Sequence, residues 1–315
     1  MTTKTAYLSV ILGAALWGTT GLFVNELNSA GFTPWEVVGI RLIFSAVILT
    51  LFLAGKNPQM LRIQARDIPF FIGTGIISIA FFNYFFFTVI QDASISLAVV
   101  LLYTGPVFVA LISRFTFGEP VTLRKIGALI LMLAGCAFTV GFLPAGSLSI
   151  SGMTILYGVL SGFFYALYSI FGKYVSGRYH SLTITVYSML FGSLFLLPTS
   201  RLWEKADLFT GTVFFYGAGL AVFATVLAYI FYTAGLKWIE SGRAAILSTV
   251  EPVVAIIIGV LLYRDAVTLW QALGMILVLA SVLLTVQIRR RRRDPGPQEI
   301  HAAGAHDQET HRQHM

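Results

Sequence analysis

Residues 243–265 read RAAILSTVEPVVAIIIGVLLYRD, and this stretch decides the class of the protein. It is long enough to cross a lipid bilayer, which takes roughly 20 apolar residues. Yet Glu251 lies inside the apolar run and is followed directly by Pro252. An unpaired, ionised carboxylate at such a depth costs roughly 2.5–3.5 kcal/mol or more, and a proline removes a backbone donor from the helix. Both features are most easily accommodated where a membrane helix faces a polar cavity rather than lipid.

The composition agrees with a membrane protein. Hydrophobic residues make up 57% of the 315 residues and charged residues 11%, with a mean hydropathy of +0.82. Soluble globular proteins average about 25% charged residues. The net charge of +7 includes the arginine run 289–293, which follows the last apolar segment. Such a run is typical of a cytoplasmic stop signal that meets anionic lipid headgroups, so we expect the lipid bilayer as a partner and no nucleic acid.

Ten apolar segments predict an all-α integral membrane protein with ten transmembrane helices. They lie at 6–24, 35–53, 68–90, 94–113, 121–141, 151–172, 182–198, 211–234, 243–263 and 267–288. With the N-terminus inside, 17 of the 21 Lys and Arg residues lie on the inner side or in the tail, whereas only Arg201, Lys205 and Arg264 lie outside. Because basic residues are retained in the cytoplasm, this bias predicts a multi-pass protein of the cell (inner or plasma) membrane with both termini cytoplasmic.

An internal repeat divides the chain. Residues 91–140 align with residues 237–286 without a gap, which places Pro106 on Pro252 and Glu119 on Asp265. Five spans in each half is an odd number, so the second half must be inserted in the opposite orientation. We predict a first repeat at 1–145, a second, inverted repeat at 146–288, and a basic, disordered cytoplasmic tail at 289–315. An inverted five-plus-five repeat is typical of transporters that work by alternating access.

Four stretches carry a family resemblance: GAALWGTTGLFVNEL (13–27), RLIFSAVILTLFL (41–53), AVVLLYTGPVFVALISRFTFGEPVTLRKIGALILMLAG (98–135) and AAILSTVEPVVAIIIGVLLYRDAVTLWQALGMILVLAS (244–281). The chain resembles the EamA-type branch of the drug/metabolite transporter (DMT) superfamily over almost all of residues 6–288. The resemblance implies ten helices, cytoplasmic termini and a central cavity built from spans one, three, four, six, eight and nine. It also implies movement of small metabolites, amino acids or drugs, often outward. Gly105 stands where the second half has Glu251, so the membrane acid is not duplicated.

Two ionisable residues lie inside predicted spans, and such residues indicate functional sites. Glu251 is predicted to take up a proton or pair with a cation, which makes it the candidate coupling residue; the alternative is a structural acid bonded to Ser248 or to another helix. Arg41, an outer-side charge, would suit a substrate carboxylate. The favoured interpretation of Arg41 is that it reaches the outer interface or pairs with Glu36.

Aromatic and polar residues in mid-span predict the cavity lining, because stacking and cation–π contacts suit an amphipathic or cationic guest. Ordinary packing is the alternative for each ring taken singly. The predicted cavity residues are Trp17, Asn83, Tyr84, Tyr103, Tyr165, Tyr168, Tyr232, Ser248 and Glu251. Two small-residue pairs, Ala14 with Gly18 and Gly158 with Gly162, occupy corresponding places in spans one and six and predict close helix packing between the halves.

No cofactor and no metal site is expected. Cys136 is the single cysteine, and the four tail histidines follow a proline- and glycine-bearing segment that is a poor preformed metal site. The expected function is a secondary transporter that exports a small-molecule substrate, such as an amino acid or a drug, with Glu251 coupling it to protons. The alternatives are a facilitative uniporter or exchanger without protons, or a channel. An enzyme is disfavoured because nucleophile, metalloprotease and nucleotide-binding motifs are lacking. A functional monomer is expected, with a dimer as the alternative.

Overall fold

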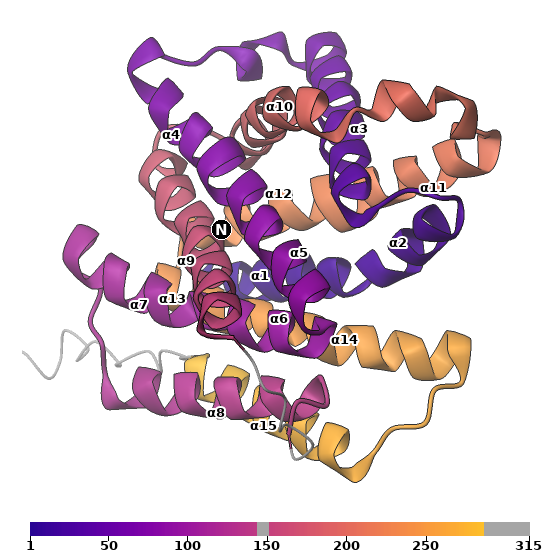
Figure 1. Cartoon of the computed structure of the whole chain (residues 1–315). Helices are drawn as coiled ribbons and strands as arrows, with labels where there is room; N and C mark the ends of the chain where they lie inside the picture. Colours follow the sequence, from indigo (N-terminus) through magenta and orange to yellow (C-terminus); the bar gives the residue numbers. More distant parts are fainter. Residues whose placement is uncertain (144–150, 287–315) are drawn as a thin grey trace, which may run out of the picture.

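The computed structural model describes residues 1–143 and 151–286, which form helices joined by short connections and contain no strand (Figure 1). The arginine run, the predicted tail and its histidines lie outside these residues. The helices of the first half are α1 (Thr3–Gly18), α2 (Thr20–Ser29), α3 (Pro34–Lys56), α4 (Ile68–Ile72), α5 (Phe81–Asp92), α6 (Ile95–Leu102), α7 (Gly105–Thr116) and α8 (Leu123–Thr139). Those of the second half are α9 (Gly152–Ser176), α10 (Ser181–Ser200), α11 (Gly211–Ala221), α12 (Ala228–Leu236), α13 (Ser241–Leu247), α14 (Glu251–Ile258) and α15 (Leu269–Thr285).

Several of these helices continue into one another through a short segment of different pitch, such as the π-helical segments Gly73–Ala80 and Val222–Leu227. Counted in this way, eight continuous helices among the described residues are long and apolar enough to cross a membrane. They are Thr3–Ser29, Pro34–Lys56, Ala65–Asp92, Ile95–Thr116, Gly152–Ser176, Ser181–Ser200, Gly211–Leu236 and Ser241–Tyr263. Each coincides with one of the ten predicted spans.

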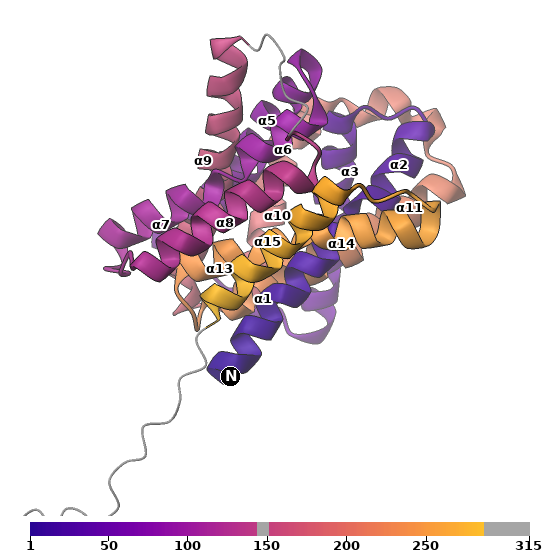
Figure 2. The same cartoon turned by 90° about the horizontal axis from the view of Figure 1, so that it is seen from below.

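The two remaining predicted spans correspond to α8 and α15, which have 17 residues each. That length is at the lower end of the range of roughly 17–25 residues for a transmembrane helix. The two helices pack against each other, side by side, along the lower edge of Figure 1 and in front of the remaining helices in Figure 2.

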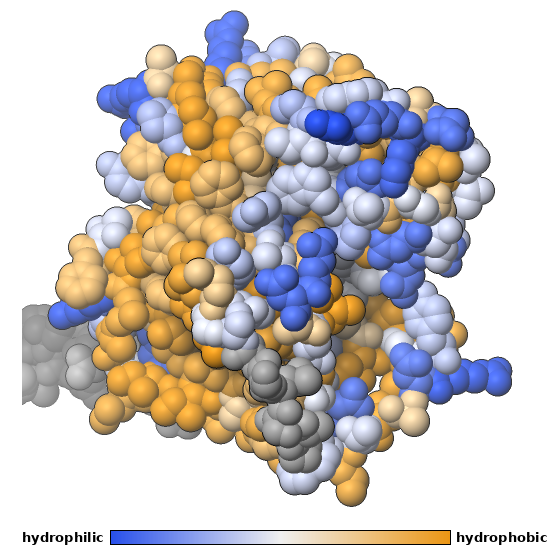
Figure 3. Space-filling view, viewed as in Figure 1, coloured by the Kyte–Doolittle hydropathy of each residue, from blue (hydrophilic) through white to orange (hydrophobic). Residues whose placement is uncertain are grey.

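Apolar side chains cover much of the face shown in Figure 3, and hydrophilic side chains gather toward its right-hand side, where α2 and α11 lie in Figure 1. Leucine, phenylalanine and isoleucine side chains on α3, α7, α8 and α15 are exposed, and Leu51, Phe115, Leu123 and Leu283 are among the most exposed of them. Exposed apolar surface of this extent is what a bilayer covers.

The matched prolines lie where two helices are interrupted. Pro106 occupies the first turn of α7 after α6 has ended at Leu102, and Pro252 occupies the first turn of α14 after a 3₁₀ turn. At each interruption a hydroxyl group bonds a nearby carbonyl oxygen: Thr104 donates to Leu101 at 2.6 Å, and Thr249 donates to Ile246 at 2.6 Å. A protein inside a bilayer needs such internal partners because lipid supplies none.

Two glycines of the predicted small-residue pairs lie against these interruptions. A Cβ atom on Gly18 would lie 2.8 Å from the carbonyl oxygen of Glu251, and one on Gly162 would lie 2.4 Å from Thr104 Oγ1 and 3.1 Å from the Gly105 nitrogen. The predicted close packing therefore occurs: α1 contacts α14, and α9 contacts the α6–α7 junction.

We expect Gly162→Ala to destabilise the protein by about 1–3 kcal/mol, because the added methyl group has no space against the α6–α7 junction. Gly127→Ala is the matched control, since Gly127 lies in α8 with no atom near its Cβ position and alanine favours a helix. The measurement is the thermal unfolding midpoint of the detergent-purified variants. Equal midpoints for Gly162→Ala and Gly127→Ala would contradict the packing described here.

Candidate functional site

A cavity of about 430 Å³ lies between the two halves of the chain. Every span that the family resemblance implied contributes to its lining, and α3 contributes as well. Its polar lining residues are Thr20, Asn25, Asn28, Arg41, Asn83, Tyr165, Tyr229 and Glu251. The cavity reaches the surface where Asn25, Asn28 and Ile95 are exposed, near the α2–α3 and α5–α6 connections.

Arg41 extends from α3 into this cavity with unused hydrogen-bond donors. Its Nε and Nη2 atoms are buried and have no partner among the described residues. The pairing with Glu36 that the sequence favoured is not formed, because Glu36 Oε2 instead accepts bonds from Lys205 Nζ at 2.7 Å and from the Thr33 backbone nitrogen at 2.6 Å. The guanidinium group therefore remains free to bind an anionic group in the cavity.

Glu251 lines the same cavity from the first position of α14. The local partner expected for it is engaged elsewhere: the Ser248 hydroxyl donates to the Ala245 carbonyl at 2.8 Å and lies 3.4 Å from the Tyr165 hydroxyl. Within residues 1–143 and 151–286, no hydrogen bond or ion pair involves the Glu251 carboxylate, and it forms no ion pair with Arg41 within 4.0 Å. The cavity therefore carries one basic and one acidic side chain that are not paired with each other.

Aromatic side chains close the inner end of the cavity. Trp17 lies 5.1 Å from Tyr229 and 5.2 Å from Tyr232, measured between ring centroids. Hydrogen bonds fix the rings of Tyr168 and Tyr232. The Tyr168 hydroxyl lies 2.9 Å from Thr233 Oγ1, and the Tyr232 hydroxyl lies 2.6 Å from Ser169 Oγ. Only about 10 Å³ of space remains among these rings. These rings form the aromatic floor of the cavity.

The structure thus brings Trp17, Arg41, Asn83, Tyr165 and Glu251 to one cavity. Tyr168 and Tyr232 lie beneath it in the aromatic floor, and Ser248 touches the cavity residue Tyr165. The other two predicted residues lie elsewhere. Tyr103 is buried among Ala110, Leu129 and Met132, and Tyr84 is 56% exposed and lines a separate apolar pocket.

Sequence reasoning missed Asn25 and Asn28, which line the mouth of the cavity. They are three residues apart on α2, so one helical face carries both amides, and that spacing was the signal available in the sequence.

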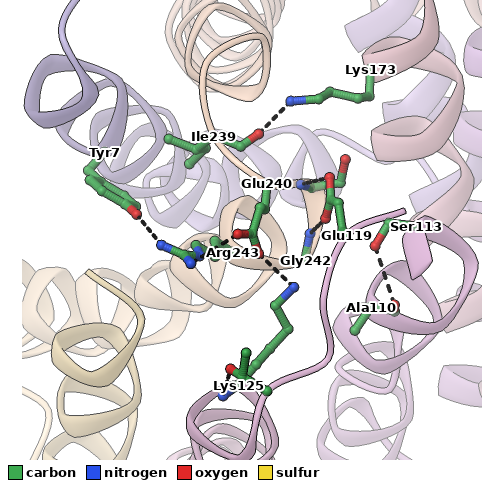
Figure 4. Close-up of polar contacts among 12 residues, drawn as sticks. Tyr7, Ala110, Ser113, Glu119, Lys125, Lys173, Ile239, Glu240, Gly242 and Arg243 are labelled. Carbon is green, nitrogen blue, oxygen red and sulfur yellow. Dashed lines mark hydrogen bonds and ion pairs between the residues drawn. The ribbon is translucent and has the colours of Figure 1, made fainter. Parts of the chain in front are cut away.

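A polar network joins the two halves around the α7–α8 connection and the start of α13 (Figure 4), at the end of the molecule opposite to the α2–α3 connection (Figure 1). Glu240 pairs with Lys125 at 2.8 Å and with Arg243 at 2.9 Å, and Arg243 also donates to the Tyr7 hydroxyl at 2.9 Å. Glu119 accepts a bond from the Ser241 backbone nitrogen at 2.7 Å. The sequence pointed to Glu119 only through the repeat and did not reveal this network.

Comparisons with known proteins agree with this architecture. The model of the EamA-like transporter family matches residues 4–141 and again residues 152–287. The chain is 29% identical over 280 residues to an uncharacterized transporter of Archaeoglobus fulgidus, covering 88% of this chain and 94% of the relative. It is 27% identical over 299 residues to the uncharacterized inner membrane transporter YicL of Salmonella typhimurium, covering 92% and 98% of the two chains.

One relative has a named substrate. The threonine/homoserine exporter RhtA of Escherichia coli is 25% identical over 259 residues, covering 81% of this chain and 82% of RhtA. A solved crystal structure shares the fold with a TM-score of 0.76 at 17% identity, covering 90% of this chain and 96% of the other. Both halves of this multi-pass membrane protein match one family model, and the chain belongs to the EamA-like transporter family.

Proposed function

We propose that the chain is a secondary transporter that exports small zwitterions of the amino-acid type by alternating access. The observation that carries this proposal is the presence of one free guanidinium group and one free carboxylate in a single cavity. The relative RhtA, named a threonine/homoserine exporter, supports the same substrate class at 25% identity.

The two charges match the two ends of a zwitterion. A guanidinium group binds a carboxylate through two parallel hydrogen bonds, and Arg41 has unused buried donors for that purpose. The Glu251 carboxylate would accept bonds from the substrate ammonium group, beside the rings of Trp17 and Tyr229, whose faces attract cations. The cavity of about 430 Å³ falls within the usual range for small-molecule sites, roughly 300–1,000 Å³.

The proposal includes ten membrane spans, in which α8 and α15 complete the two inverted repeats. The glycine contacts support this arrangement, because Gly18 against Glu251 and Gly162 against Gly105 are contacts between corresponding positions of the two halves. We also infer from the distribution of basic residues that both termini are cytoplasmic. The cavity mouth then faces outward, and the network of Figure 4 lies on the cytoplasmic side.

Proton coupling through Glu251 is part of the proposal. A carboxylate that accepts no protein hydrogen bond can bind either a proton or the substrate ammonium group, and the two would compete for it. Protons from outside would then displace the exported substrate. A facilitative exchanger without protons is the alternative within the same architecture, and the closed aromatic floor disfavours a channel.

The carboxylate subsite predicts a loss of discrimination in Arg41→Gln. The wild-type protein should bind threonine at least about tenfold more tightly than the amine that lacks its carboxylate, since a charged hydrogen-bonded pair is worth about 1.5–3 kcal/mol. Arg41→Gln should bind the two ligands equally, and Arg41→Lys should recover part of the difference because it keeps the charge without the fork. Thermal-shift titration of the purified protein measures both affinities.

Arg201→Gln is the matched control, because Arg201 is exposed and its ion-pair partner among the described residues is the exposed Glu204. Full discrimination in Arg41→Gln would show that Arg41 does not bind the carboxylate.

The coupling role of Glu251 predicts that Glu251→Gln abolishes stimulation by a pH gradient. Glutamine keeps the shape of the side chain but takes up no proton at physiological pH. We expect gradient-driven transport of threonine in proteoliposomes to fall to the rate without a gradient, while the exposed-acid variant Glu204→Gln behaves like the wild type. Gradient stimulation that persists in Glu251→Gln would favour coupling elsewhere, and none in the wild type would favour the facilitative alternative.

A further inference from the structure

Two acids at corresponding positions of the repeats have opposite surroundings. Glu119, in the α7–α8 connection, is 7% exposed and accepts bonds from the backbone nitrogens of Ser241 at 2.7 Å and Gly242 at 3.2 Å (Figure 4). These nitrogens belong to the first turn of the helix Ser241–Tyr263. Asp265, the counterpart of Glu119, is exposed, and its carboxylate has no hydrogen-bond or ion-pair partner among the described residues.

The first half contains backbone nitrogens that correspond to the two nitrogens that Glu119 bonds, and Asp265 could bond them in the same way. The repeat alignment places Ser241 and Gly242 on Ile95 and Ser96, which begin α6. The side chain of Ser94 bonds only the third nitrogen of that helix, from Leu97, at 3.2 Å. In the part of the chain that the structure describes, the nitrogens of Ile95 and Ser96 therefore bond no other residue, and Ile95 is 65% exposed.

The two sites lie at opposite ends of the molecule. Ser241 and Gly242 belong to the polar network that closes one end, whereas Ile95 lines the cavity mouth at the other. Glu119 is therefore bonded at the closed end, whereas its counterpart Asp265 is free at the open end.

We propose that Glu119 and Asp265 are alternate latches, each of which closes one end of the cavity by bonding the first turn of a helix in the opposite half. The proposal rests on alternating access as the mode of transport. In the form seen here, whose mouth faces outward in the proposed orientation, Glu119 holds the start of the Ser241–Tyr263 helix. In the inward-open form Glu119 is released, and Asp265 bonds the backbone nitrogens of Ile95 and Ser96 and closes the mouth.

The two latches are unequal in strength. Beside Glu119, the ion pair of Glu240 with Lys125 and the bond that Arg243 donates to the Tyr7 hydroxyl add to the contact between the halves. The residues at the corresponding positions beside Asp265 are uncharged: Ser94, Gln271 and Leu97. The Glu119 latch is therefore the stronger one, which makes the outward-open form the resting form of the empty protein.

The test uses a reporter that needs no substrate. In a Cys136→Ala background, Thr20→Cys places a thiol in the cavity, and a membrane-impermeant maleimide applied outside reports how open the mouth is. We expect Glu119→Ala to slow labelling, with a shift of at least about a hundredfold in the conformational ratio, since two hydrogen bonds to a charged group are lost. Glu119→Gln, which keeps one carbonyl acceptor, should slow labelling less.

The decisive variant is the double one. Asp265→Ala alone should label as the reference does, and Glu119→Ala with Asp265→Ala should label faster than Glu119→Ala, because both latches are then absent. A second readout pairs Ile95→Cys with Ala266→Cys: a short bifunctional reagent should cross-link them faster in Glu119→Ala, since cross-linking traps even a minor closed form. Glu204→Ala is the control for loss of an exposed acid, and unfolding midpoints verify that each variant is folded.

Labelling and cross-linking that are unchanged in Glu119→Ala would overturn the proposal, as would a double variant that labels as slowly as Glu119→Ala. Both readouts are independent of transport, so a failure to find zwitterion transport leaves this result interpretable. Conversely, if threonine transport is found but labelling and cross-linking are unchanged in Glu119→Ala, the latch proposal fails and the proposed function stands.

Discussion

The constraint on which this structure depends is that lipid offers no hydrogen bonds to a polar group. Many hydroxyl groups on buried helix faces therefore bond carbonyl oxygens three or four residues earlier, as Ser45, Thr139 and Ser281 do. A few buried hydroxyls, such as those of Ser78 and Thr185, lack a partner among the described residues, but a charged group without a protein partner is far more costly to bury. Arg41 and Glu251 are of this kind and lie in the same cavity, so the site is marked by bonds that the protein leaves unmade.

The interrupted helices show how the repeat produces a site that is not symmetric. Both halves break a helix at the matched proline, and in both a glycine of the other half packs against the break. At the first break the residue before the proline is Gly105, which lies under Tyr165, and at the second it is Glu251, which lines the cavity. One backbone design thus provides a close helix contact in one half and a membrane carboxylate in the other.

Much of this fold could be predicted from hydropathy, because a run of 20 apolar residues admits few structures in a membrane. Hydropathy could not predict which side of a helix faces the cavity. Membrane helices are apolar on all sides, so the faces toward lipid and toward protein have similar patterns, and Tyr84 and Tyr103 were placed in the lining on their depth alone. The bonds of Glu119 to residues 122 and 123 positions away depend on how the halves pack, which no local pattern encodes. Arg41 was identified as a charge inside a span. That it lies in the cavity and does not pair with Glu36 depends on Lys205, which pairs with Glu36 instead.

The unpaired charges also bear on how an empty carrier of this kind is kept from cycling. Closing the mouth over an empty cavity would remove water from Arg41 and Glu251, and stripping an ion of its water costs several kcal/mol. A bound zwitterion satisfies both groups at once, so the closed form of the loaded protein escapes that cost. A proton on Glu251 removes one of the two charges and lowers the cost in part. On the proposed mechanism, Arg41 and Glu251 therefore both recognise the substrate and determine when the mouth can close. The unequal strength of the two latches determines at which end the cavity of the empty protein is open.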